Sequence, residues 1–173
     1  MGIVFTIALV ISAGVLLWCR RVWCRINRLQ EPLSESYAEI DGKLRQRADK
    51  IAQLVAVTEK NGIQDGLLFI TWQDVYSRYA QAATLNDSVS AANDINNTFY
   101  HIMTLVQTHP ALIADPQFVR LQLVICDIDD ALRPGVDAFN DAVIHYNLSV
   151  QRYPDVLIAH LFGFGPKVWL ELS

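Results

Sequence analysis

The sequence predicts an all-α protein, in which an N-terminal transmembrane helix leads into an antiparallel up-down bundle of about four helices with a short C-terminal cap. Three observations predict this fold: an uncharged apolar run at the N-terminus, later segments whose apolar residues recur in steps of three and four, and glycines and prolines that fall mostly between those segments. We expect an anchor with a basic juxtamembrane segment at residues 1–28 and a helical bundle domain at residues 29–173. The first and last helices of the bundle are expected to be long.

The N-terminal run predicts an uncleaved membrane anchor. No charged side chain precedes Arg20, and the apolar segment from Ile3 to Trp23 approaches the roughly 20 residues that a membrane-spanning helix needs. A secretory signal would carry positive charge before its apolar run and a small-residue cleavage site after it, and this segment has neither. The residues that we assign to the anchor are Ile3, Val10, Leu17, Trp18, Arg20 and Arg21.

Four arginines between residues 20 and 28 predict the orientation of the anchor. Trp18 and Trp23 suit the aromatic belt at a membrane surface, and the arginines that accompany them follow the positive-inside rule. We therefore expect a single-pass membrane protein with its N-terminus outside and its bundle in the cytoplasm. A periplasmic bundle is the alternative, and the arginines count against it.

Four segments after the anchor have the apolar periodicity of amphipathic helices. They are expected from Leu33 to about Thr58, from Gln64 to about Ala82, from an N-cap at Asp87 or Ser88 to about Val106, and from Asp115 to about Val150. Pro32 is expected in the first turn of the first of these helices, where proline is best tolerated. Asn61 and Gly62 form its predicted stop signal.

The fourth segment is the longest, and the rest of the chain is expected to pack against it. Its apolar stripe is Phe118, Leu121, Ile125, Ile128, Leu132, Val136, Phe139, Val143, Tyr146 and Val150. Pro134 falls inside the stripe, and an interior proline costs about 3 kcal/mol and kinks a helix. Because the stripe resumes in phase at Val136, we expect a bend rather than a break.

Polar residues between the stripes are expected to lie on solvated helix faces. In the first helix this face comprises Glu39, Asp41, Lys43, Arg45, Arg47, Asp49 and Lys50. Asp127, Asp129 and Asp130 are interpreted in the same way, because they lack the glycine and the later glutamate of a calcium-binding loop. Cys126 is expected to be a small buried residue beside the stripe.

Several stretches together resemble the LemA family, a bacterial group of membrane-anchored helical proteins. Residues 40–55, IDGKLRQRADKIAQLV, resemble the family pattern ID-x-x-L-x-R-R-x-D-L-I-P-N-L-V, with Ala-Gln in place of Pro-Asn. HPALIA at 109–114, FVRLQ at 118–122, FNDAV at 139–143, HYN at 145–147, Tyr153-Pro154 and AHLFGF at 159–164 resemble its later patterns. The resemblance implies an antiparallel helical bundle on a single-pass anchor in the inner membrane, and it supplies no catalytic residues.

The composition and spacing of chemically active residues point away from an enzyme. A net charge of −4 argues against a general nucleic-acid binder. The chain has no Glu-x-x-His and no glutamate between Glu59 and Glu171, which excludes the carboxylate-bridged di-metal site of helical bundles. Asp141 and His145, one helical turn apart, supply two metal ligands at most and are interpreted as a surface pair. We expect no enzymatic activity, no cofactor, no metal and no small-molecule substrate.

The remaining candidates for function are surface residues near the C-terminal cap. They are Tyr146, Asn147, Tyr153, Pro154, Leu161, Phe162 and Phe164. The simpler interpretation is that these residues, with Leu157, fold back and close the core, and that Asn147 satisfies backbone groups there; the alternative is a docking site for a protein partner or the membrane face. We thus expect a non-enzymatic scaffold or adaptor that contacts the bilayer and a protein partner or a second copy. The alternative is a metal-binding or enzymatic bundle.

Overall fold

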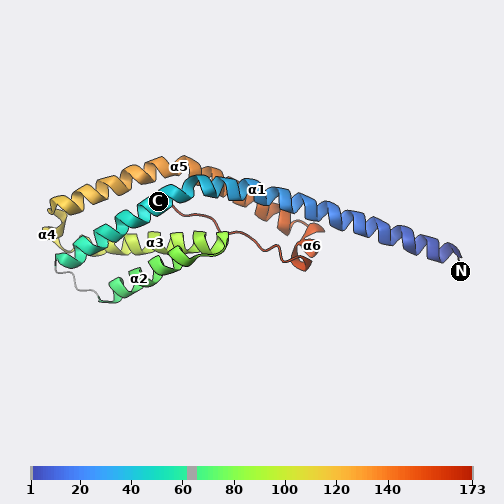
Figure 1. The fold of residues 1–173 in the computed structure, drawn as a ribbon, viewed down its shortest axis with the longest axis horizontal. Coiled ribbons are helices and arrows are strands. Elements are labelled where there is room, and N and C mark those ends of the chain that lie inside the picture. The colour runs from blue at the N-terminus through green and yellow to red at the C-terminus, as the bar shows by residue number, and fades with distance from the viewer. Residues whose placement is uncertain (1, 62–65, 173) are drawn as a thin grey trace. The chain divides into compact units, whose positions relative to one another are not determined.

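The computed structural model describes residues 2–61 and 66–172, and the elements found in those residues are helices (Figure 1). They are α1 (Gly2–Lys60), α2 (Gly66–Gln81), α3 (Leu85–Val106), α4 (Pro110–Ile113), α5 (Pro116–Gln151) and α6 (Asp155–Leu161). The chain divides into two compact units. One, the anchor unit, comprises residues 1–35 and 141–167, and the other, the bundle unit, comprises residues 36–140 and 168–173.

Helix α1 continues through Pro32, so the prediction of a separate helix that starts near Leu33 is wrong. A proline inside a helix removes one backbone hydrogen bond, and buried residues of α1 lie on either side of Pro32. The buried residues before and after Pro32 lie in one phase of a single helix, because Ile26, Leu33 and Tyr37 follow one another in steps of seven and four. The two apolar patterns that appeared separate in the sequence therefore belong to one helix.

Helix α5 confirms the predicted stripe. All ten residues of the predicted stripe, from Phe118 to Val150, are buried. The helix is continuous through Pro134. It begins at Pro116, and Asp115 caps it by accepting hydrogen bonds from the backbone N–H groups of Gln117 (2.7 Å) and Phe118 (3.1 Å). A short helix that the sequence did not predict, α4, precedes this cap.

The cap at Asp115 predicts a pH-dependent stability. The two backbone N–H groups, first that of Phe118, lower the pKa of the Asp115 carboxyl below its ordinary value of 3.8. Since the folded pKa is the lower one, the stabilisation is present at neutral pH and is lost as the pH falls below about 4 through the folded pKa. We expect Asp115→Asn to lower the thermal midpoint at pH 7, and the difference from the unsubstituted protein to shrink between pH 7 and pH 2.5. A difference that stayed constant between these pH values would contradict this expectation.

The N-terminus of α3 differs from the prediction. The N-cap is Thr84, whose hydroxyl oxygen accepts a hydrogen bond from the backbone N–H of Asp87 (3.2 Å), and neither Asp87 nor Ser88 is the cap. Asp87 lies instead in the first turn, where a negative charge interacts favourably with the helix dipole. The helix α1 ends at Lys60, next to the predicted stop, while the predicted start of α2 at Gln64 lies outside the described residues.

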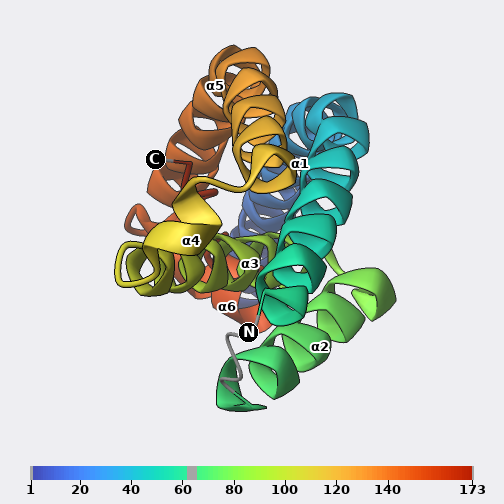
Figure 2. The same ribbon diagram turned by 90° about the vertical axis from the view of Figure 1, so that its left-hand side faces the viewer.

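The core of the bundle unit is formed by residues from five helices, each of which is labelled in Figure 2. Buried residues that represent these helices are Ile51 (α1), Trp72 (α2), Ile102 (α3), Leu112 (α4) and Ile125 (α5). Fully burying a side chain of this size contributes about 1.5–3 kcal/mol, so these residues stabilise the unit more than its surface ion pairs do.

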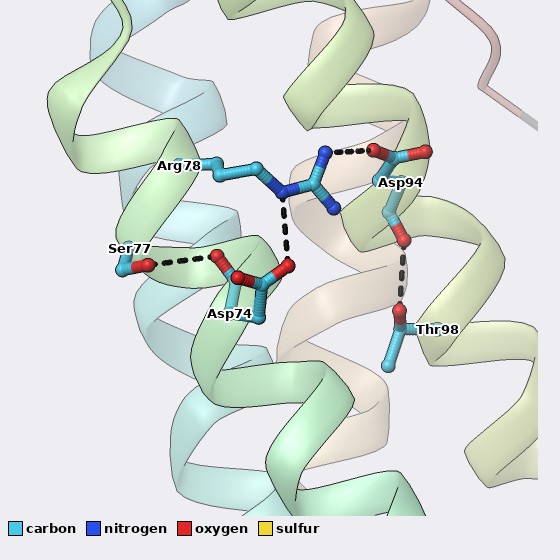
Figure 3. A network of polar contacts seen from close by, with 5 residues as sticks. All are labelled: Asp74, Ser77, Arg78, Asp94 and Thr98. Carbon is cyan, nitrogen blue, oxygen red and sulfur yellow. Dashed lines mark hydrogen bonds and ion pairs between the residues drawn. The ribbon is translucent and has the colours of Figure 1, made fainter.

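Helix α2 packs along α3, and Figure 3 shows the polar contacts between them. The Arg78 guanidinium donates to Asp74 on its own helix (3.1 Å) and to Asp94 on α3 (2.9 Å). These side chains are exposed, so the pairs add little to stability. The main contribution comes from Trp72 and Val75, which α2 buries in the core.

At Gly135 the backbone of α5 lies close to a side chain of α1. A Cβ atom at this position would overlap the Cγ2 methyl of Ile40, which is itself buried. Overpacking against a rigid β-branched residue costs about 1–3 kcal/mol, and the gain in helix propensity offsets about 1 kcal/mol of that cost. We therefore expect Gly135→Ala to destabilise the bundle unit by up to about 2 kcal/mol.

Gly42 is the matched control for Gly135. It lies inside α1 and is exposed, and a Cβ atom there would meet nothing within 4 Å. Gly42→Ala is therefore expected to raise stability by about 0.5–1 kcal/mol. Urea denaturation of both variants measures the difference, and equal signs of the two effects would contradict the close approach at Gly135.

Candidate functional site

The first part of α1 is apolar and exposed over its whole length. An 18-residue window has a mean hydropathy of 2.4 and none of it is buried, so α1 is long and apolar enough to cross a membrane. The assigned anchor residues Ile3, Val10 and Leu17 are 77%, 69% and 68% exposed. Trp18 is half-buried, and Arg20 and Arg21 are exposed.

Beyond Trp18, α1 gains a buried face within the anchor unit. Val22 and Ile26 are buried there, as are Ile158 and Ala159 on α6. Helix α6 is fixed to α1 by an ion pair between Arg25 and Asp155, the first residue of α6. The Asp155 side chain is only 9% exposed, whereas that of Arg25 is 51% exposed.

A cleft of about 460 Å³ lies beside this ion pair, within the anchor unit. The residues that line it are Trp18, Arg21, Val22, Cys24, Arg25, Arg28 and Asp155. Three arginines and one aspartate leave the cleft with an excess of two positive charges at neutral pH. In the sequence these arginines predict only the orientation of the anchor. Their common cleft has no signal in the sequence, because Asp155 lies more than a hundred residues away along the chain.

Tyr146 and Asn147 hold the C-terminal segment of the anchor unit. Tyr146 is fully buried, and the Lys167 ammonium lies 5.8 Å from the centre of its ring. The Asn147 side chain donates to the backbone carbonyl of Lys167 (2.9 Å) and accepts from its N–H (2.7 Å). Neither residue presents a free docking surface, because one is buried and the amide of the other is occupied by backbone.

Two further asparagines, neither of them predicted from the sequence, bind the C-terminal segment of the bundle unit. Asn140 on α5 exchanges two hydrogen bonds with the backbone of Leu170, each 2.9 Å long. Asn93 on α3 accepts from the N–H of Glu171 and donates to the carbonyl of Trp169. The amide side chains thus form hydrogen bonds with backbone N–H and C=O groups of residues 169–171, a segment that lies outside the helices. One signal was available, since Asn140 and Asn147 are seven residues apart and lie on one face of α5.

The other candidates at the cap differ in exposure. Tyr153, Leu161 and Phe162 are 78%, 75% and 51% exposed, and Pro154 is exposed as well. The interpretation that they close the core is therefore wrong for these residues, and also for Leu157, which is 59% exposed. Phe164 is half-buried. Helix α6 buries one face and leaves its apolar opposite face uncovered.

Arg47 corrects the prediction that every charged residue of its helix face is solvated. Its side chain is 5% exposed and forms an ion pair with Asp129. The same guanidinium donates to Asn96 Oδ1 (2.9 Å) and lies 5.5 Å from the centre of the Phe99 ring. A buried arginine with this many partners joins α1, α3 and α5, so we assign Arg47 and Asp129 to the structure rather than to chemistry.

Two tyrosines of the bundle unit, Tyr37 and Tyr79, have raised pKa values. Burial and the nearby Asp41 carboxylate raise the pKa of Tyr37, and burial raises the pKa of Tyr79, so both phenols stay protonated at neutral pH. Within residues 2–61 and 66–172, His, Cys, Asp and Glu side chains form no group of three or more that suits a metal ion. Cys126 is exposed, which corrects the expectation that it is buried.

The comparison with protein families agrees with the motifs. The model of the LemA family matches residues 36–173, which is most of the chain and includes all of the bundle unit. No curated protein matches the chain. The chain belongs to the LemA family.

Proposed function

We propose that this protein is a membrane-anchored, non-enzymatic scaffold. In this proposal α1 crosses the bacterial inner membrane once, with the N-terminus outside, and the bundle unit is an antiparallel four-helix bundle in the cytoplasm. The observation that carries the proposal is the exposure of ten large apolar side chains between Ile3 and Leu17, each at least half exposed. Contiguous apolar surface of this extent needs a cover, and a bilayer covers a helix on all sides.

The proposed orientation depends on charge. The four arginines between residues 20 and 28 follow the apolar span directly. Basic residues close to the end of a span favour the cytoplasmic side. These arginines therefore support a cytoplasmic bundle.

We further propose that the exposed apolar face of α6 and its flanks bind a protein partner. The residues concerned are Tyr153, Pro154, Leu161 and Phe162. Exposed aromatic side chains of this kind provide large contact areas at a small entropic cost, as they do in protein interfaces. The scaffold would then recruit its partner through the anchor unit and hold it close to the membrane.

Site-specific photo-cross-linking tests this proposal. A photoreactive amino acid at Leu161 of the full-length protein, in native membranes, is expected to give one discrete protein adduct, which the double substitution Tyr153→Ser and Phe162→Ser removes. The same amino acid at Ile70, which is 69% exposed on α2, is the control and should not give this adduct. Adducts with lipid only, or none, would contradict protein docking at α6.

A further inference from the structure

We propose that the cleft beside Trp18 binds the headgroup of an anionic membrane phospholipid. The inference rests on the proposed insertion of α1 into a membrane and goes beyond it, because a helix inserts without any preference for one headgroup. Three features of the anchor unit support it: the charge of the cleft, its position along α1, and the way in which the fold fixes it.

The charge of the cleft suits a phosphodiester. Arg21, Arg25 and Arg28 are separated by four and three residues, so they project from one face of α1. Arg25 is partly neutralised by Asp155. Arg21 and Arg28 form no ion pair with any other described residue, and their guanidinium groups remain available for bidentate contacts with phosphate oxygens.

The position of the cleft suits a lipid rather than a dissolved anion. With a rise of 1.5 Å per residue, Arg21 lies about 4.5 Å and Arg25 about 10 Å beyond Trp18 along α1. Side chains of a helix lean toward its N-terminus, which here is the membrane side, so these arginines point back toward the headgroup layer. Trp18 and Val22 add an apolar wall, which a glycerol backbone or acyl chain would contact and a free phosphate would leave empty.

The cleft is fixed by tertiary structure. Asp155 belongs to α6, is nearly buried, and holds the Arg25 guanidinium at one wall. A disordered basic tail attracts anionic lipids through its charge alone and depends little on which residue carries it. In a fixed cleft, by contrast, an arginine that lines the wall contributes to lipid binding, and a neighbouring arginine on another face of the helix does not. This difference provides the test.

Arg20 and Arg21 form the matched pair for this test. They are adjacent, both are exposed, and only Arg21 lines the cleft. Full-length protein in an uncharged detergent is titrated with dioctanoyl phosphatidylglycerol, dioctanoyl phosphatidylcholine or inorganic phosphate, and native mass spectrometry measures the bound fraction. We expect phosphatidylglycerol to bind at least tenfold more tightly than the other two. Arg21→Gln is expected to weaken its binding about fivefold, and Arg20→Gln less than twofold.

Each other outcome overturns the inference. Equal binding of the two lipids would exclude headgroup recognition, and phosphate that binds as tightly as phosphatidylglycerol would indicate a site for a free anion. Equal losses in Arg20→Gln and Arg21→Gln would indicate diffuse charge. Membrane fractionation of the same variants reports on the anchor separately, so a failed headgroup site is distinguishable from a failed anchor. Thermal midpoints within about 2 °C of the unsubstituted protein establish that both variants are folded.

Discussion

Asp129→Ala is expected to destabilise the bundle unit by about 3–5 kcal/mol, the cost of removing one partner from a buried ion pair. The side chain of Arg47 is 5% exposed, and Asp129 is its counter-charge. Without this carboxylate the guanidinium retains its hydrogen bond to Asn96 and its contact with the Phe99 ring, but its positive charge stays buried without a counter-charge. Because a domain has only about 5–15 kcal/mol of net stability, a loss of this size brings the unit close to unfolding at room temperature.

Urea denaturation, followed by circular dichroism, measures the effect. Asp130→Ala is the matched control, since Asp130 is adjacent, its side chain is 72% exposed, and its contact with Arg133 is 3.8 Å long. It should change stability by less than about 0.5 kcal/mol. The double substitution Arg47→Met and Asp129→Leu removes both charges and is expected to recover most of the loss. Equal losses in Asp129→Ala and Asp130→Ala would contradict the buried pair.

Two arginines in the apolar part of α1 are expected to release the protein from the membrane. An arginine near the centre of a span costs about 2.5–3.5 kcal/mol, so Ile7→Arg and Val10→Arg together cost about 5–7 kcal/mol. The ten large apolar residues from Ile3 to Leu17 contribute about 3–6 kcal/mol at 0.3–0.6 kcal/mol each, and two of them are lost in the variant. The free-energy cost of the two arginines exceeds the contribution of the remaining apolar residues, so we expect α1 of this variant not to insert into the membrane.

Carbonate extraction of membranes, followed by immunoblotting, measures this release. Ile70→Arg with Leu123→Arg is the control, because these apolar residues are 69% and 61% exposed in the bundle unit and lie outside the span. The control should stay in the membrane pellet. If the Ile7 and Val10 variant also stayed there, α1 would not be the anchor.

Sequence periodicity was sufficient to predict the buried faces of the helices. All ten residues of the α5 stripe are buried as predicted, because a helix with one buried face has apolar residues every three or four positions in the sequence. The same reasoning placed a boundary at Pro32, where the structure has none. Proline weakens a helix locally, and whether the helix continues depends on packing on both sides, which a local pattern does not contain.

The polar contacts were the part that the sequence could not reveal. Arg47, like Arg45, lies in a mixed-charge segment with aspartates nearby in the sequence, yet Arg45 is exposed and Arg47 is buried. The difference comes from Asp129, which is 82 residues away. Likewise, the cleft at Arg21 depends on α6, and the asparagines that bind the C-terminal segment depend on a segment without periodicity. Such long-range pairings are set by the tertiary fold.

The orientation of the bundle is the central claim that one measurement tests most directly. A reporter that is active only in the cytoplasm and one that is active only in the periplasm are each fused after Ser173 of the full-length chain, and their activities are compared at equal expression. The arginines that follow the span predict a signal from the cytoplasmic reporter alone. A signal from the periplasmic reporter alone would contradict the account and would place both the bundle and the basic cleft on the outer side of the membrane.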